Sequence, residues 1–420
     1  MRLYRRTAGA VLCAALLTAT IRAQGGDDIA RVMEEPAVRA ALDAARSQEP
    51  AAIADQIRLC EIPAPPFKEA ARAQAYAEAF RAVGLQAVRI DAAGNVLGTR
   101  PGRTAGPRVV ISAHLDTVFP EGTPVRVTRS GSLLSGPGIG DDCRGLAVIL
   151  AVVRALDAGG VQTGGPITFV GTVGEEGLGD LRGVKALFGE TLRGQVDRFV
   201  SIDGDGHSIT NVSVGSVRYR VTFRGPGGHS YNSFGIANPI HAVGRAVAHV
   251  AELEVPGEPR TTFSVGRIGG GTSVNAIAAD AWIEVDLRSS SPPALAALEG
   301  QFRERMQKAL DEENARWRQR GRLTMELERV GDRPAGRTAE ESPTVRAAVA
   351  VTRALGLPVR LEEGSTDSNV PMNLGVPAIT VGSGGTGAGA HTLAETFDST
   401  DSWRGTQRMV LLAVALSASR

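Results

Sequence analysis

The sequence has almost no net charge, few cysteines and no serine-nucleophile motif. Its 46 Lys and Arg residues are balanced by 45 Asp and Glu residues, so it lacks the basic field that binds nucleic acid. Three cysteines cannot supply a disulfide framework, so the fold must be stabilised by a hydrophobic core. The absence of a G-x-S-x-G elbow argues against a serine hydrolase of the α/β type. At 420 residues the chain has room for roughly two or three domains.

The first 23 residues have the pattern of an export signal. MRLYRR is basic, TAGAVLCAALLTATI is apolar but too short to span a bilayer comfortably, and a small-residue cleavage point follows near Ala23. We therefore predict a signal peptide at 1–23 and a periplasmic or secreted chain with no stable membrane anchor after cleavage. Only Cys60 and Cys143 would then remain, and they allow one disulfide at most.

Continuous apolar runs predict a sheet that is covered on both faces by helices. The predicted strands lie at 107–116, 166–176, 197–206 and 376–385. Helical patterns occur between and beside them, at 65–83, 145–157 and 343–355. The sequence therefore predicts a three-layer α/β domain with a mostly parallel sheet.

From residue 216 the apolar period changes to two. Apolar and polar residues alternate in SVRYRVTFR, as they do in a strand with one buried and one solvent-exposed face. The same pattern occurs in AWIEVDLR and RLTMELE. A further strand is predicted at 261–268, and helices are predicted at 238–254 and 293–320. The order β-α-β-β-α-β predicts a ferredoxin-like domain inserted at 216–328, between two parts of the α/β domain at 24–215 and 329–420.

Acids and histidines follow the predicted strands of the α/β domain where each strand ends. They are His114, Asp116, Glu175, Glu176, Asp203 and His391, and a glycine-rich loop adds Asp141. The carboxyl ends of strands in an open α/β sheet line one crevice, so these side chains should converge. Imidazoles and carboxylates together have the ligand chemistry of a pair of Zn²⁺-like ions. Such a pair holds a bridging water and polarises a carbonyl, so the sequence implies hydrolysis.

The adjacent glutamates predict two different roles. Neighbouring side chains on an extended segment point to opposite sides, so we expect one to bind metal and the other to act as general base. Asp116, two residues after His114, is expected to accept the second N–H of the imidazole. Asp142 is expected to cap the helix that follows the glycine-rich loop.

Six motifs in order resemble the M20 family of metallopeptidases, which includes peptidase T, glutamate carboxypeptidase, and the succinyl-diaminopimelate and acetylornithine deacylases. The motifs are HLDTV, GIGDDCRG, GEEGLGD, SIDG, GGHS and a C-terminal GAH. The resemblance implies that Glu175 is the catalytic base and that Asp141 bridges two metal ions. The implied metal ligands are His114, Asp141, Glu176, Asp203 and His391.

The resemblance also implies that the inserted domain is a lid and dimerisation domain. His229 matches a histidine that reaches the facing active site across a homodimer, and Asn275 and Arg288 match residues that contact substrate. In this family an Asp at the position of Asp203 tends to accompany aminopeptidases. The expected cofactor is two divalent ions, zinc first, although Mn²⁺ and Co²⁺ share these ligands. Cys143 departs from the family's Asp-Asp-Lys-Gly-Gly pattern, and we expect it to be a small buried residue.

The predicted function is therefore an exported two-metal aminopeptidase that acts on short peptides. A carboxypeptidase or an N-acyl-amino-acid deacylase of the same family is the alternative. An alternative of another class is a periplasmic solute-binding protein, which closes on a ligand between two lobes. Such a protein needs no clustered metal ligands, so the acids and histidines at the strand ends argue against it.

Overall fold

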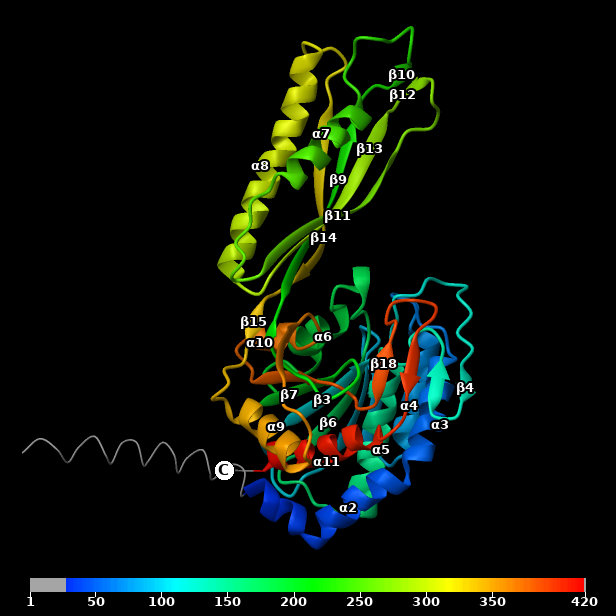
Figure 1. Ribbon diagram of the computed structural model, residues 1–420, viewed down its shortest axis with the longest axis vertical. Helices are drawn as coiled ribbons and strands as arrows, with labels where there is room; N and C mark the ends of the chain where they lie inside the picture. The colour runs from blue at the N-terminus through cyan, green and yellow to red at the C-terminus, as the bar shows by residue number, and fades with distance from the viewer. Residues whose placement is uncertain (1–27, 419–420) are drawn as a thin grey trace, which may run out of the picture.

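The computed structural model describes residues 28–418, and the predicted export signal at 1–23 lies outside them. Figure 1 shows an elongated molecule in which the middle of the chain forms a narrow domain that projects from a larger α/β body. Within the described part of the chain, no helix combines the length and the apolar composition needed to cross a membrane.

The α/β body is built around a nine-stranded sheet. Its strands are β1 (Gln86–Ile90), β2 (Val96–Arg100), β3 (Val109–His114), β6 (Ile167–Thr172), β7 (Arg198–Ile202), β8 (Ile209–Ser213), β15 (Gly336–Arg337), β16 (Leu361–Gly364) and β17 (Ala378–Val381). Their order is β1-β2-β6-β3-β7-β17-β8-β15, with β16 beside β8. The central neighbours β6, β3, β7 and β17 are parallel, as predicted, and antiparallel strands flank them.

Helices cover both faces of this sheet and make the three predicted layers. They are α2 (Pro36–Ser47), α3 (Glu49–Cys60), α4 (Ala70–Ala82), α5 (Cys143–Ala158), α6 (Arg182–Ala186), α9 (Pro343–Ala354), α10 (Asn369–Asn373) and α11 (Trp403–Ser417). Successive residues of β3 enter opposite cores: Val109 and Ile111 pack with α2, α5 and α11, whereas Val110 packs with α6 and α10. The central helix α5 contacts α2, α3, α11 and β3, which fixes its N-terminus at the edge of the sheet.

The projecting domain is a four-stranded antiparallel sheet with two helices on one face (Figure 1). Its elements are β9 (Gly215–Arg224), α7 (Pro239–Ala251), β11 (Thr261–Gly270), β13 (Asp280–Ser289), α8 (Pro292–Arg316) and β14 (Thr324–Arg333). The chain order is the predicted β-α-β-β-α-β, and the spatial order is β11-β13-β9-β14. The predicted boundary at 328 is too early, because β14 continues through an irregularity between Arg329 and Gly331 as far as Arg333.

Candidate metal centre

The five predicted ligands converge at the carboxyl edge of the parallel strands. His114 ends β3, Asp203 directly follows β7, and Glu176 lies four residues after β6. Asp141 precedes α5, and His391 lies between two short strands, β18 (Thr386–Ala388) and β19 (Thr396–Asp398). Potential ligand atoms form three groups, each with all its atoms within 4.8 Å of one another: His114, Asp141 and Asp203; Asp141, Glu176 and His391; and His114, Glu175 and Glu176. Asp141 joins the first two groups, and His114 and Glu176 each belong to two groups as well.

The carboxylate of Asp141 lies between the two histidines. Its Oδ1 is 2.9 Å from Nε2 of His114, and its Oδ2 is 3.0 Å from Nε2 of His391. Glu176 lies on the His391 side of Asp141, and its Oε1 is 3.2 Å from Nε2 of His391. One oxygen of a single carboxylate thus faces each histidine, which is the arrangement that two bridged divalent ions need.

The charges of this cluster also suit cations. Burial, reinforced by the charges of Asp141 and Glu176, raises the pKa of Asp203 to about 7 although His114 opposes the shift. Burial likewise disfavours ionised Asp141, but its contacts with both histidines outweigh this and hold the pKa of Asp141 below its usual range. The hydrogen bonds that His391 donates to Asp141 and Glu176 raise the pKa of His391 to about 10. Crowded buried carboxylates need cations to stay ionised, and this oxygen and nitrogen donor set fits Zn²⁺ and similar ions.

Asp116 lies beside His114 and also accepts hydrogen bonds from the backbone of Glu175 and Glu176. Nδ1 of His114 is 3.0 Å from the main-chain carbonyl of Asp116 and 3.7 Å from Oδ1 of its carboxylate. A proton on Nδ1 leaves Nε2 free to face Asp141. The carboxylate of Asp116 accepts the backbone N–H of Glu175 at 3.0 Å and that of Glu176 at 2.8 Å. This second contact was not predicted from the sequence.

The two glutamates lie on a sharply bent segment, here called the glutamate turn, although Glu176 itself has extended backbone angles of φ −81° and ψ 143°. Strand β6 ends at Thr172, and the pair is flanked by Gly174 with φ 67° and Gly177 with φ 50°. These left-handed backbone angles favour glycine and bend the chain. The expectation that Glu175 and Glu176 face opposite sides is therefore wrong, because an oxygen of each carboxylate lies within 4.8 Å of the other.

The start of α5 is fixed by a cap and by a disulfide. Asp142 accepts the N–H of Gly145 at 3.1 Å, which is the predicted cap, and it also accepts the N–H of His114 at 3.0 Å. Cys143 is buried, as expected, and forms a disulfide with Cys60 at the end of α3, with the Cα atoms 5.4 Å apart. The loop that carries Asp141 is thereby anchored at its helical end.

His229 and Asn275 lie close together but far from the cluster of their own chain. His229 is in β10 (Gly228–His229), which pairs with β12 (Ala276–Ile277) directly after Asn275. Figure 1 shows both short strands at the end of the projecting domain that is remote from the α/β body. Within one chain the structure therefore does not bring these two residues to the predicted ligands.

Arg288 lies at the opposite end of the projecting domain, near the cluster. It pairs across the sheet with Ser216, and Arg333 pairs with the same serine from the other side. Directly opposed residues share a sheet face, so both arginines lie on one face. Arg333 donates from Nη1 to Oε1 of Glu175 at 2.9 Å and from Nη2 to the main-chain carbonyl of Glu175. Sequence reasoning missed Arg333, because a basic residue before a proline in a linker carries no specific signal.

The sequence profile of peptidase family M20/M25/M40 matches residues 110–415. The chain belongs to this family. Two solved structures show the same fold as this M20 chain. A tripeptidase from Staphylococcus aureus is 22% identical with a TM-score of 0.71, over 87% of this chain and 97% of that one. A dinuclear metal-binding M20 peptidase from Bacillus subtilis is 18% identical with a TM-score of 0.63, over 89% of this chain and 99% of that one.

The curated relatives of this M20 chain are named after different enzymatic activities. Carboxypeptidase G2 of Pseudomonas sp. (strain RS-16) is 31% identical over 186 residues, which are 41% of this chain and 41% of that protein. A succinyl-diaminopimelate desuccinylase of Nitrosospira multiformis is 28% identical over 215 residues, which are 46% of this chain and 56% of that protein. The chain thus spans about half the length of these curated relatives.

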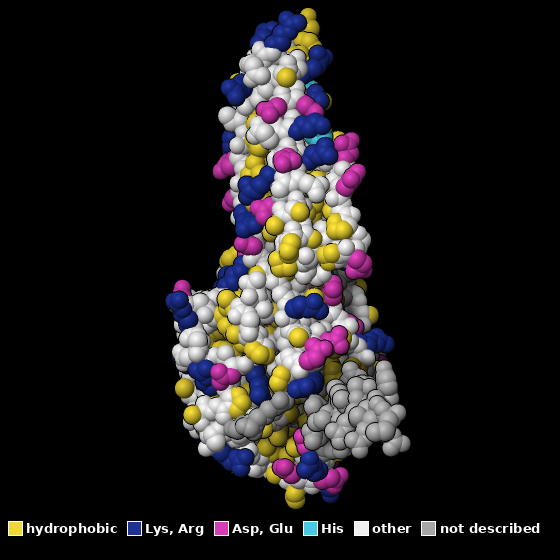
Figure 2. Space-filling model, turned by 90° about the vertical axis from the view of Figure 1, so that its left-hand side faces the viewer, with side chains coloured by type: hydrophobic (Ala, Val, Ile, Leu, Met, Phe, Trp, Pro, Cys, Tyr) yellow, Lys and Arg dark blue, Asp and Glu magenta, His cyan; other side chains and the backbone are white. Residues whose placement is uncertain are grey.

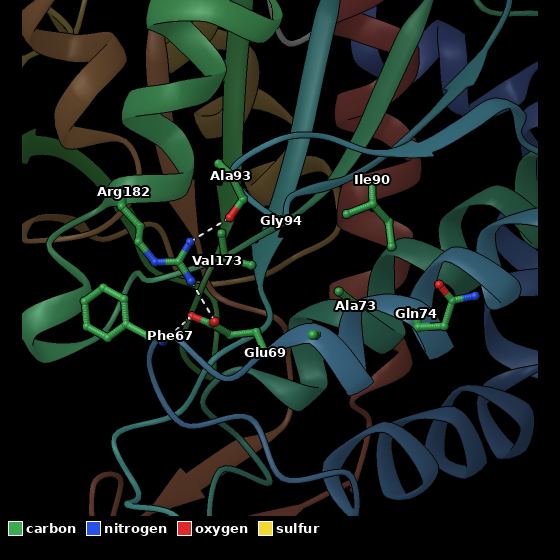
Figure 3. Close-up of a pocket in the computed structure, with 10 residues that line it drawn as sticks. Phe67, Glu69, Ala73, Gln74, Ile90, Ala93, Gly94, Val173 and Arg182 are labelled. Carbon is green, nitrogen blue, oxygen red and sulfur yellow. Dashed lines mark hydrogen bonds and ion pairs between the residues drawn. The ribbon is translucent and has the colours of Figure 1, made fainter.

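A cavity of about 510 Å³ lies next to the glutamate turn of this M20 chain, but no predicted ligand lines it. Figure 3 shows Arg182 at its edge, with hydrogen bonds to the carbonyl of Ala93 and the carboxylate of Glu69. The stem of Arg182 packs on Gly174, where an added Cβ would lie 2.6 Å from Cγ of the arginine. The wall of this cavity therefore supports the turn that carries Glu175, and the cavity is separate from the candidate metal centre.

Proposed function

We propose that this M20 chain is a two-metal exopeptidase that removes N-terminal residues from short peptides. The observation that carries the proposal is the carboxylate of Asp141, whose two oxygens lie 2.9 Å from His114 and 3.0 Å from His391. The proposed ligands are His114 and Asp203 for one ion, Glu176 and His391 for the other, and Asp141 for both. Zinc is the proposed metal, and Mn²⁺ and Co²⁺ accept the same donors. Membership of a peptidase family supports amide-bond hydrolysis.

The chain's own residues supply the proton transfer. When bound, two divalent ions polarise the substrate carbonyl and lower the pKa of water. Glu175 is the proposed general base, which takes a proton from the attacking water and delivers it to the leaving nitrogen. Burial raises the pKa of Glu175, and the positive charge of Arg333 opposes this shift. A carboxylate with a raised pKa is a stronger base near neutral pH than an exposed one. Asp116 keeps that base in place through the backbone of the turn.

We further propose a homodimer formed through the projecting domain. His229 and Asn275 can act on a metal centre only if a second copy supplies that centre, because they are remote from the one in their own chain (Figure 1). Large apolar side chains are exposed beside them, with exposed fractions of 84% for Tyr231, 74% for Phe234 and 102% for Val274. Exposed apolar groups gathered at one end of a domain favour a protein contact there.

A periplasmic or secreted location is also proposed. The disulfide between Cys60 and Cys143 supports it, because disulfides persist in oxidising compartments. Figure 2 shows acidic and basic side chains interspersed along the face in view, without a continuous basic field. This pattern favours a small-molecule or peptide substrate over nucleic acid.

A carboxypeptidase or an N-acyl-amino-acid deacylase is the second candidate. Arg218, Arg288 and Arg333 lie on the sheet face that reaches the glutamate turn, where Arg218 donates to the carbonyl of Gly177. Asp286 pairs with both Arg218 and Arg288. Guanidinium groups in such a cluster suit a substrate carboxylate, which they bind in a bidentate manner. The names of the curated relatives favour the same alternative.

Metal content and blocked peptides test these candidates. The dialysed protein should hold two divalent ions per chain, and a chelator should abolish peptide cleavage until metal is restored. An aminopeptidase should lose activity on a tripeptide when its N-terminus is acetylated and keep it when its C-terminus is amidated. Loss on amidation alone would identify a carboxypeptidase, and cleavage of an N-acyl amino acid would identify a deacylase. A metal-free protein that binds a solute and cleaves nothing would refute the peptidase and support the solute-binding alternative.

A further inference from the structure

Glu395 is a buried acid that none of the predicted roles uses. It is 2% exposed and lies four residues after His391, directly before β19. Strand β19 pairs with β5 (Leu133–Ser135), so Glu395 lies beside the start of the glycine-rich loop at 136–142. Within residues 28–418, the ion pairs of the structure include no lysine or arginine bound to Glu395.

The carboxylate of Glu395 accepts three backbone N–H groups from the loop that carries Asp141. Oε2 accepts the N–H of Gly138 at 2.9 Å, and Oε1 accepts those of Gly140 at 2.8 Å and Asp141 at 3.0 Å. The main-chain carbonyl of Glu395 also accepts the N–H of Gly136 at 3.0 Å. Successive N–H groups that point at one anion form a concave backbone site, and here the anion is part of the chain itself.

Two glycines of this loop have different structural reasons: Gly138 has a left-handed backbone, and Gly140 lies against the carboxylate of Glu395. Gly138 has φ 79°, and an added Cβ there would lie 2.7 Å from Cγ2 of Thr117. An added Cβ at Gly140 would lie 3.2 Å from Oε1 of Glu395. The absence of a side chain at Gly140 therefore leaves room for the carboxylate of Glu395 against the loop.

We propose that Glu395 is a positioning residue for the metal centre. Its carboxylate fixes the backbone at residues 138–141, so that the side chain of Asp141 lies between His114 and His391. Because Glu395 follows His391 on the same short segment, it holds together two ligand-bearing segments that are about 250 residues apart in the sequence. The inference rests on the proposed function, because it assumes that Asp141 and His391 bind metal.

Substitution of Glu395 should weaken metal binding more than it weakens the fold. In Glu395→Gln the amide group must present a donor to one of the three backbone N–H groups, and Glu395→Ala removes all three hydrogen bonds. Outer partners of metal ligands contribute about 10–100-fold to metal affinity, so the dissociation constant of at least one ion should rise by that factor. Glu313→Gln is the matched control, because Glu313 is buried in the projecting domain and accepts the N–H of Asn238 at 3.1 Å.

The experiment titrates Zn²⁺ into the metal-free proteins against a chromophoric chelator. The thermal midpoint and the hydrogen exchange of amides 138, 140 and 141 are measured without metal. The proposal expects weaker Zn²⁺ binding and faster exchange at these amides in the Glu395 variants, and unchanged Zn²⁺ affinity in Glu313→Gln even where its thermal midpoint falls. Wild-type Zn²⁺ affinity in both Glu395 variants would overturn the proposal alone, as would an equal loss of affinity in Glu313→Gln. A wild-type protein that binds no divalent ion would overturn the proposed function and this proposal together.

Discussion

Breaking the disulfide between Cys60 and Cys143 should destabilise the protein strongly, because the bond closes a long loop. The two residues are 83 positions apart in the sequence. A cross-link over a loop of that length removes chain entropy from the unfolded state worth roughly 4.5 kcal/mol at 25 °C. Domains have a net stability of about 5–15 kcal/mol, so this term is a large part of the total. The expected decrease in the free energy of unfolding is about 2–4 kcal/mol, since measured values usually fall short of the entropic limit.

Urea unfolding of the metal-free protein measures this effect without a contribution from bound ions. The parent protein with Cys13 replaced by alanine is compared in its oxidised and reduced forms, so both sulfur atoms stay in the core. Reduction should lower the urea midpoint of the parent. The same reductant should leave the midpoint of a Cys60→Ala/Cys143→Ala variant unchanged. Equal midpoints for the oxidised and the reduced parent would refute the loop-entropy argument.

Three further predictions concern the metal centre and its neighbours. Glu175→Gln should keep both metals and lower the turnover number by about 10²–10⁴-fold, whereas Glu176→Ala should lose a metal. If metal analysis shows the reverse, Glu175 is the metal ligand and Glu176 is the general base. Arg333→Ala should lower the free energy of unfolding by about 3–5 kcal/mol, because it leaves the buried carboxylate of Glu175 without its partner; an unchanged urea midpoint would contradict this. A His229→Ala chain mixed with a Glu175→Ala chain should form heterodimers with one working site, and a verified heterodimer without activity would exclude a role for His229 across the interface.

The positions of His114, Glu176 and Asp203 could be read from the sequence because each follows a predicted strand, whereas Asp141 and His391 were assigned as ligands through the family resemblance. Continuous apolar runs identified the parallel strands, and parallel strands end at one edge of a sheet. His114 and Asp203 were therefore placed by strand geometry alone. The projecting domain was found for a similar reason, since apolar and polar residues alternate along β9 and β13, and in β13 the burial alternates from residue to residue as well.

Contacts that depend on the exact path of the backbone could not be read in the same way. The partner of Glu175 is Arg333, which is 158 residues away and is brought near only because β14 continues beyond its predicted end. Glu175 and Glu176 were placed on an extended segment because apolar residues precede them, but flanking glycines turn the chain. Two cysteines permitted a disulfide, and only the packing of α3 against α5 brings Cys60 to Cys143.

The projecting domain enters and leaves the α/β body through two strands that run side by side. Ser213 of β8 pairs with Gly336 of β15, and Ser216 of β9 pairs with Arg333 of β14. Opposed residues in antiparallel strands lie about 4.5–5.5 Å apart, a gap that a two-residue hairpin turn can close. The whole projecting domain is thus joined to the α/β body by two neighbouring strands. We expect that it can be removed or replaced by another domain while the strands of the α/β sheet keep their pairing register.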